Sequence, residues 1–223
     1  SEVFTKERSR FILSKGHASI ALYVVLERLG LISHDDLYKM NLGGILGEHP
    51  DHNIPGIDVD TGSLGHGLAI GAGFAYSSKL RKNNHRCYVM LGDGECNEGA
   101  VWEAAMLAGN LTLSNLTAIV DRNHLCIHGR VEDINGLDPV EKKWAAFGWH
   151  VQTVDGHDYD ALKRCFLEPH ENKPTVVIAR TIKGKGVSFM ENDASWHHGG
   201  INDEQFNSAL KQLVESVDEE VND

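Results

Sequence analysis

The sequence lacks any apolar run close to the roughly 18 residues that a membrane-spanning helix requires. Its opening stretch, SEVFTKERSRF, is charged and lacks the apolar centre of a secretory signal peptide. Neither a transmembrane protein nor a secreted one is therefore expected, and a cytoplasmic location is the default prediction.

Basic residues are scarce as well. Lys and Arg together number 21 against 32 Asp and Glu, so the formal net charge is −11. Nucleic acids and anionic membranes bind to basic surfaces, so neither is an expected partner. An anionic ligand in such a chain has to be neutralised locally, by a metal ion, by histidines or by helix N-termini.

Cysteine pairs with CxxC spacing are also missing, although the chain has four cysteines, Cys87, Cys96, Cys126 and Cys165. This argues against a zinc knuckle or a redox dithiol and favours four free thiols. Nothing near Cys96 in the sequence lowers its pKa clearly, so we interpret it as a passive thiol.

Short β-rich segments alternate with longer helical ones, which predicts an α/β fold. Strands are expected at Cys87–Leu91, Leu116–Asp121, His150–Val154 and Thr175–Thr181, and helices at Ala18–Leu29, Gly67–Arg81, Gly99–Asn110, Val140–Phe147, Tyr159–Phe166 and Asp203–Val214. Two of the strands are near-continuous apolar runs, as buried parallel strands require. We expect one domain over residues 1–223 and an acidic tail at 215–223 that frays.

The most informative segment runs from Cys87 to Leu125. An apolar strand ends at Gly92-Asp93-Gly94, a helix follows, and a second apolar strand ends just before Asn123. In such a βαβ unit the two strands lie parallel, so Asp93 and Asn123 should meet at one edge of the sheet. Ligands of open α/β sheets bind at this edge.

These residue types suit a magnesium diphosphate. Mg²⁺ prefers oxygen ligands and keeps phosphate oxygens, and Asp93 and Asn123 offer a carboxylate and an amide oxygen. Gly92 and Gly94 let the backbone approach phosphates closely, and the helix that begins near Gly99 directs its N-terminus at an anion. The structural alternative is a tight turn at GDG with Asn123 as a helix cap, but the spacing and the second strand favour the metal site.

GDG followed by a later DxN resembles the signature of thiamine diphosphate enzymes. The segments RFILSKGHASIALYVVLERLG, HPDHNIPGIDVDTGSLGHGL and ARTIKGKGVSF resemble transketolase in particular, most closely the N-terminal subunit of its two-chain form. The resemblance extends from about Arg8 to about Leu213. It implies a three-layer fold, an open and mostly parallel sheet with helices on both faces.

The resemblance also implies the ligands of the cofactor. Asp93, the side chain of Asn123 and the carbonyl of Leu125 match the family's ligands to Mg²⁺, for which Ca²⁺ or Mn²⁺ can substitute. The positions that match contacts to thiamine diphosphate are His17, Gly62, Leu64, Gly92, Asp93, Gly94, Glu95, Asn123 and His198. Without the family, His17 also reads as a loop or capping histidine.

By the same resemblance, His17, His49 and His198 match histidines with catalytic roles, and His49 matches one that binds the donor sugar. His197 lies next to His198 in WHHGG, so the match does not separate the two. A metal pair of His49 and His52 is disfavoured because no third ligand is evident. Glu98 and Glu103 match glutamates at the family's subunit interface. Lys183 and Lys185 in KGKG read as a surface turn.

The implied function is transfer of a two-carbon ketol unit from a ketose phosphate to an aldose acceptor. The implied partner is the C-terminal, pyrimidine-binding subunit, in an α2β2 heterotetramer. Family members also carry a segment before the SKGH region, with a further active-site histidine, that this sequence does not contain. Two alternatives stay open: another thiamine diphosphate enzyme, such as a deoxyxylulose-phosphate synthase-like protein, and a catalytically silent structural subunit.

Overall fold

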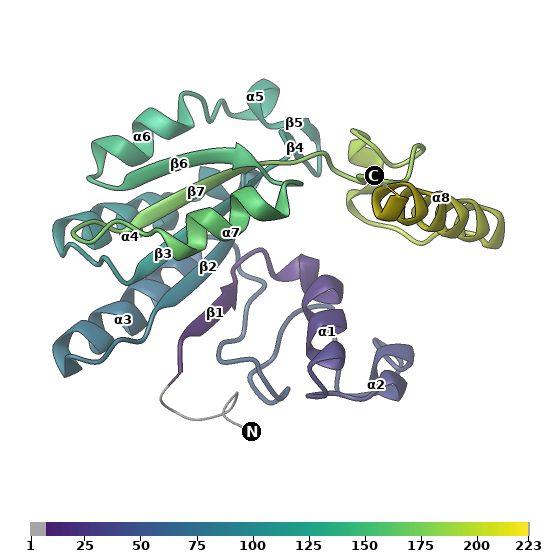
Figure 1. Cartoon of the computed structure of the whole chain (residues 1–223), viewed down its shortest axis with the longest axis horizontal. Coiled ribbons are helices and arrows are strands. Elements are labelled where there is room, and N and C mark those ends of the chain that lie inside the picture. Colours follow the sequence, from purple (N-terminus) through teal and green to yellow (C-terminus); the bar gives the residue numbers. More distant parts are fainter. Residues whose placement is uncertain (1–7, 223) are drawn as a thin grey trace.

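Five parallel strands form one open sheet at the centre of the chain (Figure 1). The computed structural model describes residues 8–222, with side chains up to residue 215. The strand order is β1–β2–β3–β7–β6. The strands are β1 Arg10–Leu13, β2 Cys87–Gly92, β3 Leu116–Arg122, β7 Thr175–Arg180 and β6 His150–Asp155, while the short strands β4 Leu125–Cys126 and β5 Gly129–Arg130 pair separately.

Helices cover both faces of the sheet, which confirms the predicted α/β architecture (Figure 1). Helices α3, α4 and α6 pack on one face, and α7 lies on the other. The α-helices are α1 Ser19–Arg28, α2 His34–Tyr38, α3 His66–Arg81, α4 Gly99–Asn110, α5 Val131–Ile134, α6 Val140–Ala146, α7 Tyr159–Leu167 and α8 Asp203–Asn222, with 3₁₀ turns η2 Gly16–Ala18, η3 Gly94–Asn97 and η4 Ala194–His197.

The main core lies between the sheet and the α3–α4 layer. Val89 and Leu91 of β2 and Ala105 of α4 are completely buried there. A side chain at Gly71 would begin only 2.4 Å from the Val89 Cγ2 atom, so glycine lets α3 lie directly on β2. Small residues on both helices thus allow a thin, tightly packed layer, because packing in protein interiors leaves no room for an added methyl group.

A second, smaller core supports the long segment 40–65, which has little regular structure. Leu46 and Ile54 from this segment are buried against Tyr23 and Leu26 of α1. The Tyr23 hydroxyl donates to the carbonyl oxygens of Gly47 and His49, at 3.1 and 2.9 Å. The segment is therefore packed against α1, and His49 has a fixed backbone position.

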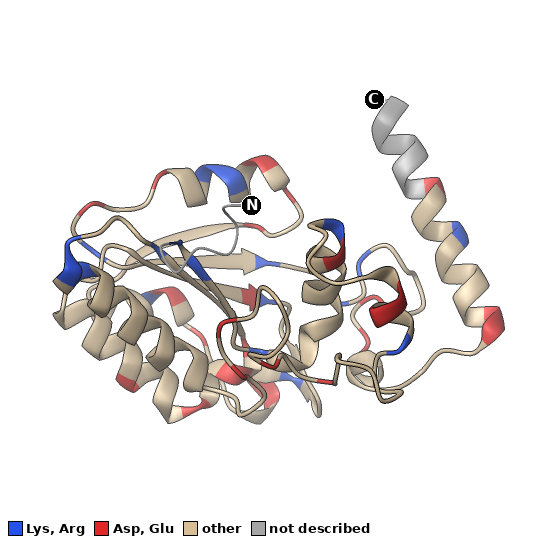
Figure 2. Ribbon diagram, turned by 90° about the horizontal axis from the view of Figure 1, so that it is seen from below, with Lys and Arg blue, Asp and Glu red and all other residues tan. Residues whose placement is uncertain are grey.

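Several short elements were not expected from the sequence. Strand β1 has only four residues, and α2 begins at a capping box in which Ser33 and Asp36 bond reciprocally. The β4–β5 hairpin and α5 are equally short. Helix α8 continues to Asn222 and lies apart from the sheet (Figure 2). Fraying of the acidic tail stays a prediction, since side chains after 215 and residue 223 lie outside the described part.

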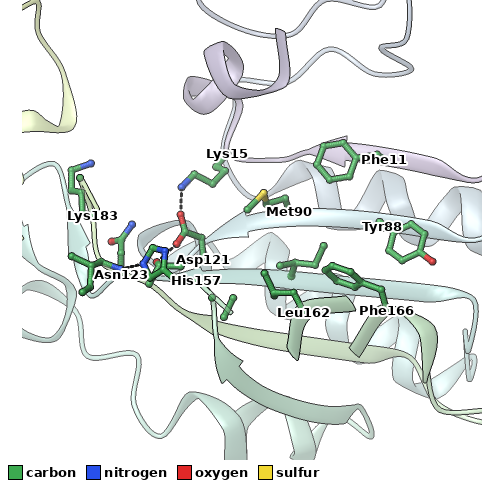
Figure 3. Close-up of a pocket in the computed structure, with 16 residues that line it drawn as sticks. Phe11, Lys15, Tyr88, Met90, Asp121, Asn123, His157, Leu162, Phe166 and Lys183 are labelled. Atoms are coloured by element: carbon green, nitrogen blue, oxygen red, sulfur yellow. Dashed lines mark hydrogen bonds and ion pairs between the residues drawn. The ribbon is translucent and has the colours of Figure 1, made fainter. Parts of the chain in front are cut away.

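The face of the sheet that α7 covers also carries a cavity, next to that helix. It has a volume of about 690 Å³ and is lined mainly by apolar side chains such as Phe11, Tyr88 and Met90 of the sheet and Leu162 and Phe166 of α7 (Figure 3). Within residues 8–222, no helix combines the length and apolarity needed to cross a bilayer.

A buried carboxylate joins three segments at the carboxyl edge of the sheet. Glu95 is 3% exposed. Its Oε1 atom accepts hydrogen bonds from the Ser14 hydroxyl and from the Gly65 N–H at 2.9 Å, and its Oε2 atom accepts one from the Gly92 N–H at 3.0 Å. Glu95 thus ties together the residue after β1, the start of α3 and the end of β2.

We expect Glu95→Ala to lower the free energy of unfolding by about 2–4 kcal/mol, because it leaves three buried donors without an acceptor. Urea denaturation of both proteins measures the difference. Glu168→Ala, which removes an exposed glutamate after α7, should stay within about 0.5 kcal/mol of the parent. Equal losses in the two variants would contradict a structural role for Glu95.

Candidate functional site

The parallel register brings the segments that follow β1, β2, β3 and β7 to one edge of the sheet. Gly92 pairs with Asp121, and Arg122 pairs with Arg180, so these strands end nearly level. A cavity of about 620 Å³ opens at this edge. All the residues that the sequence analysis assigned to cofactor, metal or catalysis line it: His17, His49, Gly62, Leu64, Gly92, Asp93, Gly94, Glu95, Asn123, Leu125 and His198.

Asp93 is the most buried acidic residue of this cavity, with 2% of its surface exposed. Its Oδ1 atom accepts a hydrogen bond from the Gly94 N–H at 2.7 Å, and Oδ2 accepts one from the His124 N–H at 2.6 Å. Burial raises the pKa of Asp93, and these two N–H groups act in the opposite direction. A divalent cation beside the carboxylate would stabilise its charged form.

Asn123 directly follows β3 and lines the same cavity as Asp93. Its side-chain oxygen accepts a hydrogen bond from the Leu125 N–H at 3.0 Å, which turns the chain so that Leu125 also lines the cavity. Asp93, Asn123 and Leu125 thus line one cavity, and a carboxylate, an amide oxygen and a main-chain carbonyl are the ligand types that suit a hard divalent ion.

Two glycines shape the walls of the cavity. Gly62 has a φ of 139°, and a Cβ atom there would lie 3.0 Å from the His49 ring. A Cβ atom on Gly94 would meet the Cβ atom of Cys126 at 3.0 Å. Both positions thus leave room for a ligand or a ring where a side chain would intrude.

His17 and His197 come from distant parts of the sequence and face each other with their ring centroids 5.1 Å apart. Partial burial and then the neighbouring Lys15 lower the pKa of His17, and burial and then Lys183 lower the pKa of His197. Both rings are accordingly neutral at pH 7. An anion between them would favour their protonated forms.

The structure distinguishes the adjacent histidines of WHHGG. His197 is half-buried, and its Nδ1 atom is buried without a hydrogen-bond partner among the described residues. His198 is exposed, although it also lines the cavity. A buried unpaired nitrogen at a cavity wall is suited to contact a ligand, so the geometry favours His197 for the inner position.

Two lysines add positive charge that the sequence did not indicate. The Lys15 ammonium lies 2.7 Å from Asp121 Oδ2, and the Thr181 hydroxyl donates to the other oxygen of Asp121 (Figure 3). Burial raises the pKa of Asp121, but Lys15 and Thr181 outweigh it and the net shift is downward. Lys183 also lines the cavity; burial and then Lys15 lower its pKa.

The loop that carries Lys183 is fixed by a histidine outside this cavity. The Ile182 N–H donates to His157 Nε2 at 2.8 Å (Figure 3). KGKG is a turn with Lys185 exposed, as its composition predicts, but Lys183 lines the cavity. The place of Lys183 at the cavity depends on this tertiary contact, so the local sequence does not predict it.

Arg122 is a further residue that no sequence pattern indicated. It separates Asp121 and Asn123 in the sequence, and its guanidinium is buried with its Nη1 atom 3.3 Å from Asp93 Oδ2.

Burial raises the pKa of the Cys96 thiol, which agrees with its interpretation as a passive thiol. Glu48 lines the cavity next to His49.

His49 and His52, disfavoured from the sequence as a metal pair, lie in different surroundings in the structure. His49 lines the cavity, whereas His52 is exposed and bonds Asp60 at 2.7 Å, with Asp51 nearby. These three exposed side chains satisfy one another and lie outside the cavity.

Taken together, the cavity fits a diphosphate with a divalent ion. Oxygen ligands lie at the ends of β2 and β3, glycines leave space beside them, and the unpaired His197 nitrogen can bond an anion. Lys15 and Lys183 supply local positive charge in a chain whose net charge is −11.

Comparisons with known proteins identify the family of the chain. The family described as "Transketolase, thiamine diphosphate binding domain" matches residues 2–219. The chain is 43% identical to an apulose-4-phosphate transketolase subunit of Phocaeicola vulgatus, over 95% of this chain and 76% of that protein. It is 40% identical to a 6-deoxy-6-sulfo-D-fructose transketolase subunit of a Clostridium species, over 93% of this chain and 77% of that protein.

Solved structures agree in fold. The transketolase of Campylobacter jejuni superposes with a TM-score of 0.88 at 31% identity, covering 93% of this chain. The match covers 34% of the Campylobacter chain, so this chain spans about a third of a transketolase of that length.

We expect inorganic pyrophosphate to raise the pKa of His17, because an anion stabilises the imidazolium that burial and neighbouring cations disfavour in the free site. The pKa can be followed by NMR titration of the histidine ring signals with and without pyrophosphate. His34 on α2, whose side chain is 69% exposed, serves as the control and should not respond. An unchanged His17 titration would contradict anion binding between His17 and His197.

Proposed function

The chain belongs to the transketolase family, and we propose that it is the diphosphate-binding subunit of a two-chain, thiamine diphosphate-dependent transferase. In this proposal the enzyme moves a two-carbon ketol unit from a ketose phosphate to an aldose acceptor. The observation that supports it most is that Asp93 and Asn123 line one cavity together with Gly94 and a group of cationic side chains.

In this proposal Asp93, the Asn123 side chain and the Leu125 carbonyl bind Mg²⁺, and Ca²⁺ or Mn²⁺ can replace it. All three are oxygen ligands, which a hard ion requires, and they leave coordination positions for phosphate oxygens. The lysines Lys15 and Lys183 offset the charge of the diphosphate, and Gly92 and Gly94 let the backbone approach it closely.

The histidines act on either side of this anion. His17 and His197 bind the diphosphate, with His198 as the alternative to His197, and their neutral rings can accept a proton at pH 7. His49 is held by its backbone contact to Tyr23 and by Gly62, so its ring can orient the donor sugar. Gly62 and Leu64 line the space for the aminopyrimidine ring.

When bound, thiamine diphosphate supplies the nucleophilic carbon that a ketose carbonyl requires. The protein's share in this chain is positioning and charge: Asp93 and Asn123 fix the metal, the cations offset the diphosphate, and His17 and His49 exchange protons with donor hydroxyls.

The partner in this proposal is the C-terminal, pyrimidine-binding subunit, in an α2β2 heterotetramer. Support comes from two relatives that are named as transketolase subunits and that this chain matches over three quarters of their length. Their names refer to sugars or sugar phosphates, so a sugar phosphate is the substrate class we propose here.

We expect Asp93→Ala to abolish Mg²⁺-dependent binding of thiamine diphosphate, because it removes the one charged metal ligand we assign. Asn123→Ala should weaken binding roughly tenfold, since a neutral oxygen contact contributes about 1–3 kcal/mol. Calorimetry on the complete complex of both chains measures both affinities.

Asp160→Ala is the matched control, because it removes an exposed aspartate from the first turn of α7. It should bind with parental affinity. Parental affinity in Asp93→Ala would overturn the metal assignment, and absence of binding in the parent complex would favour a silent structural subunit.

We expect the complex to release glyceraldehyde phosphate continuously from a ketopentose phosphate donor only when an aldose acceptor is added, because without one the two-carbon unit stays in the site after a single turnover. Pyruvate should be inactive as a donor, because the SKGHAS and TGSLGHG segments match transketolase. A coupled assay with both donors compares the rates. Turnover of pyruvate would instead favour a deoxyxylulose-phosphate synthase-like enzyme.

A further inference from the structure

Arg122 occupies an unusual place at the carboxyl edge of the sheet. It is the last residue of β3, and its side chain is only 2% exposed. Its guanidinium contacts three carboxylates: Asp93 Oδ2 at 3.3 Å, Glu132 Oε1 at 2.6 Å and Asp138 Oδ1 at 3.0 Å. It is not among the residues that line the cofactor cavity.

The hydrogen bonds of Asp93 divide unequally between its two oxygens. Oδ2 is used by Arg122 and by the His124 N–H, whereas Oδ1 receives only the Gly94 N–H among the hydrogen bonds of the described residues. A carboxylate oxygen has two lone pairs, so Oδ1 retains one for a further partner. The protein thereby fixes which oxygen of Asp93 is available.

We propose that Arg122 is a positioning residue for the divalent ion. It holds Asp93 Oδ2 on the protein side, so that the carboxylate presents Oδ1 to the metal. This inference deepens the proposed function and rests on the metal assignment made there. Mg²⁺ requires near-ideal octahedral geometry, so a carboxylate held in one rotamer favours it.

Glu132 and Asp138, in turn, fix the position of the Arg122 guanidinium. Glu132 also accepts hydrogen bonds from the Leu137 N–H at 3.1 Å and the Asp138 N–H at 3.3 Å, which closes the loop after α5 around its carboxylate. The planar guanidinium can bridge several carboxylates at once, which a lysine ammonium cannot do with the same geometry. The orientation of Asp93 therefore depends on a loop outside the cavity.

The sign of the effect separates positioning from charge. A cation beside a metal ligand repels the metal, so loss of Arg122 would tighten metal binding if charge alone mattered. Glu132 and Asp138 already offset that charge. Positioning predicts the opposite result, weaker binding when Arg122 is lost.

The experiment uses Mn²⁺ with thiamine diphosphate on the complete complex. Electron paramagnetic resonance counts free Mn²⁺ and reports the symmetry of the bound ion. We expect Arg122→Met to weaken Mn²⁺ binding roughly 10-fold or more, as losses of residues that orient metal ligands do. We expect a broader bound spectrum as well. Lys163→Met removes an exposed cation from α7 and is the control for net charge.

Glu132→Gln keeps the proposal testable if Arg122→Met does not fold. It leaves Asp93 and Arg122 in place but loosens the guanidinium, so Mn²⁺ affinity should fall several-fold. Because the lost Glu132 charge alone would also weaken binding, the broader spectrum of the bound ion is the readout that indicates positioning. Parental affinity in Glu132→Gln, or tighter binding in a folded Arg122→Met protein, would overturn the inference. If the parent complex binds no Mn²⁺, the metal assignment itself fails and this inference falls with it.

Discussion

The parallel pairing of β1, β2, β3 and β7 is the constraint on which the rest of the structure depends. Pairing in this register ends the strands at one edge, so segments far apart in the sequence meet there. Glu95 then fixes the edge by joining the ends of β1 and β2 to the start of α3. The position of Asp93 and Asn123 in the cavity is a consequence of this arrangement, because they directly follow β2 and β3.

Electrostatics at this edge follow from the same geometry. Asp93 and Asp121 end neighbouring strands in a buried setting, where charge is costly unless it is compensated. Arg122 and two main-chain N–H groups stabilise the charged form of Asp93, and Lys15 stabilises the charged form of Asp121. Burial and the nearby lysines also leave His17 and His197 neutral, so the free site holds less charge than its residue count suggests.

The sequence predicts the elements whose pattern is local and strong. The β-branched runs at β3 and β7 and the long helices α3 and α4 lie close to the expected bounds. Strand β1 was missed because four residues are too few to show a period, whereas α2 could have been found from its Ser33 capping box. Asp93 and Asn123 were accessible through the βαβ rule. Lys183 and Arg122 were not, since a charged residue is expected to be exposed until its tertiary contacts are known. Here the contacts are that of His157 to Ile182, next to Lys183, and that of Glu132 to Arg122.

The separation between the buried strands and the cavity has an evolutionary consequence. The candidate ligands lie at the ends of strands or in loops, so substitutions that change the shape of the cavity leave most of the buried β-core untouched. A scaffold of this kind tolerates amino-acid substitutions in its loops without loss of folding stability. The two relatives, named for different sugars yet each at least 40% identical to this chain, are what such a scaffold would be expected to generate by divergence.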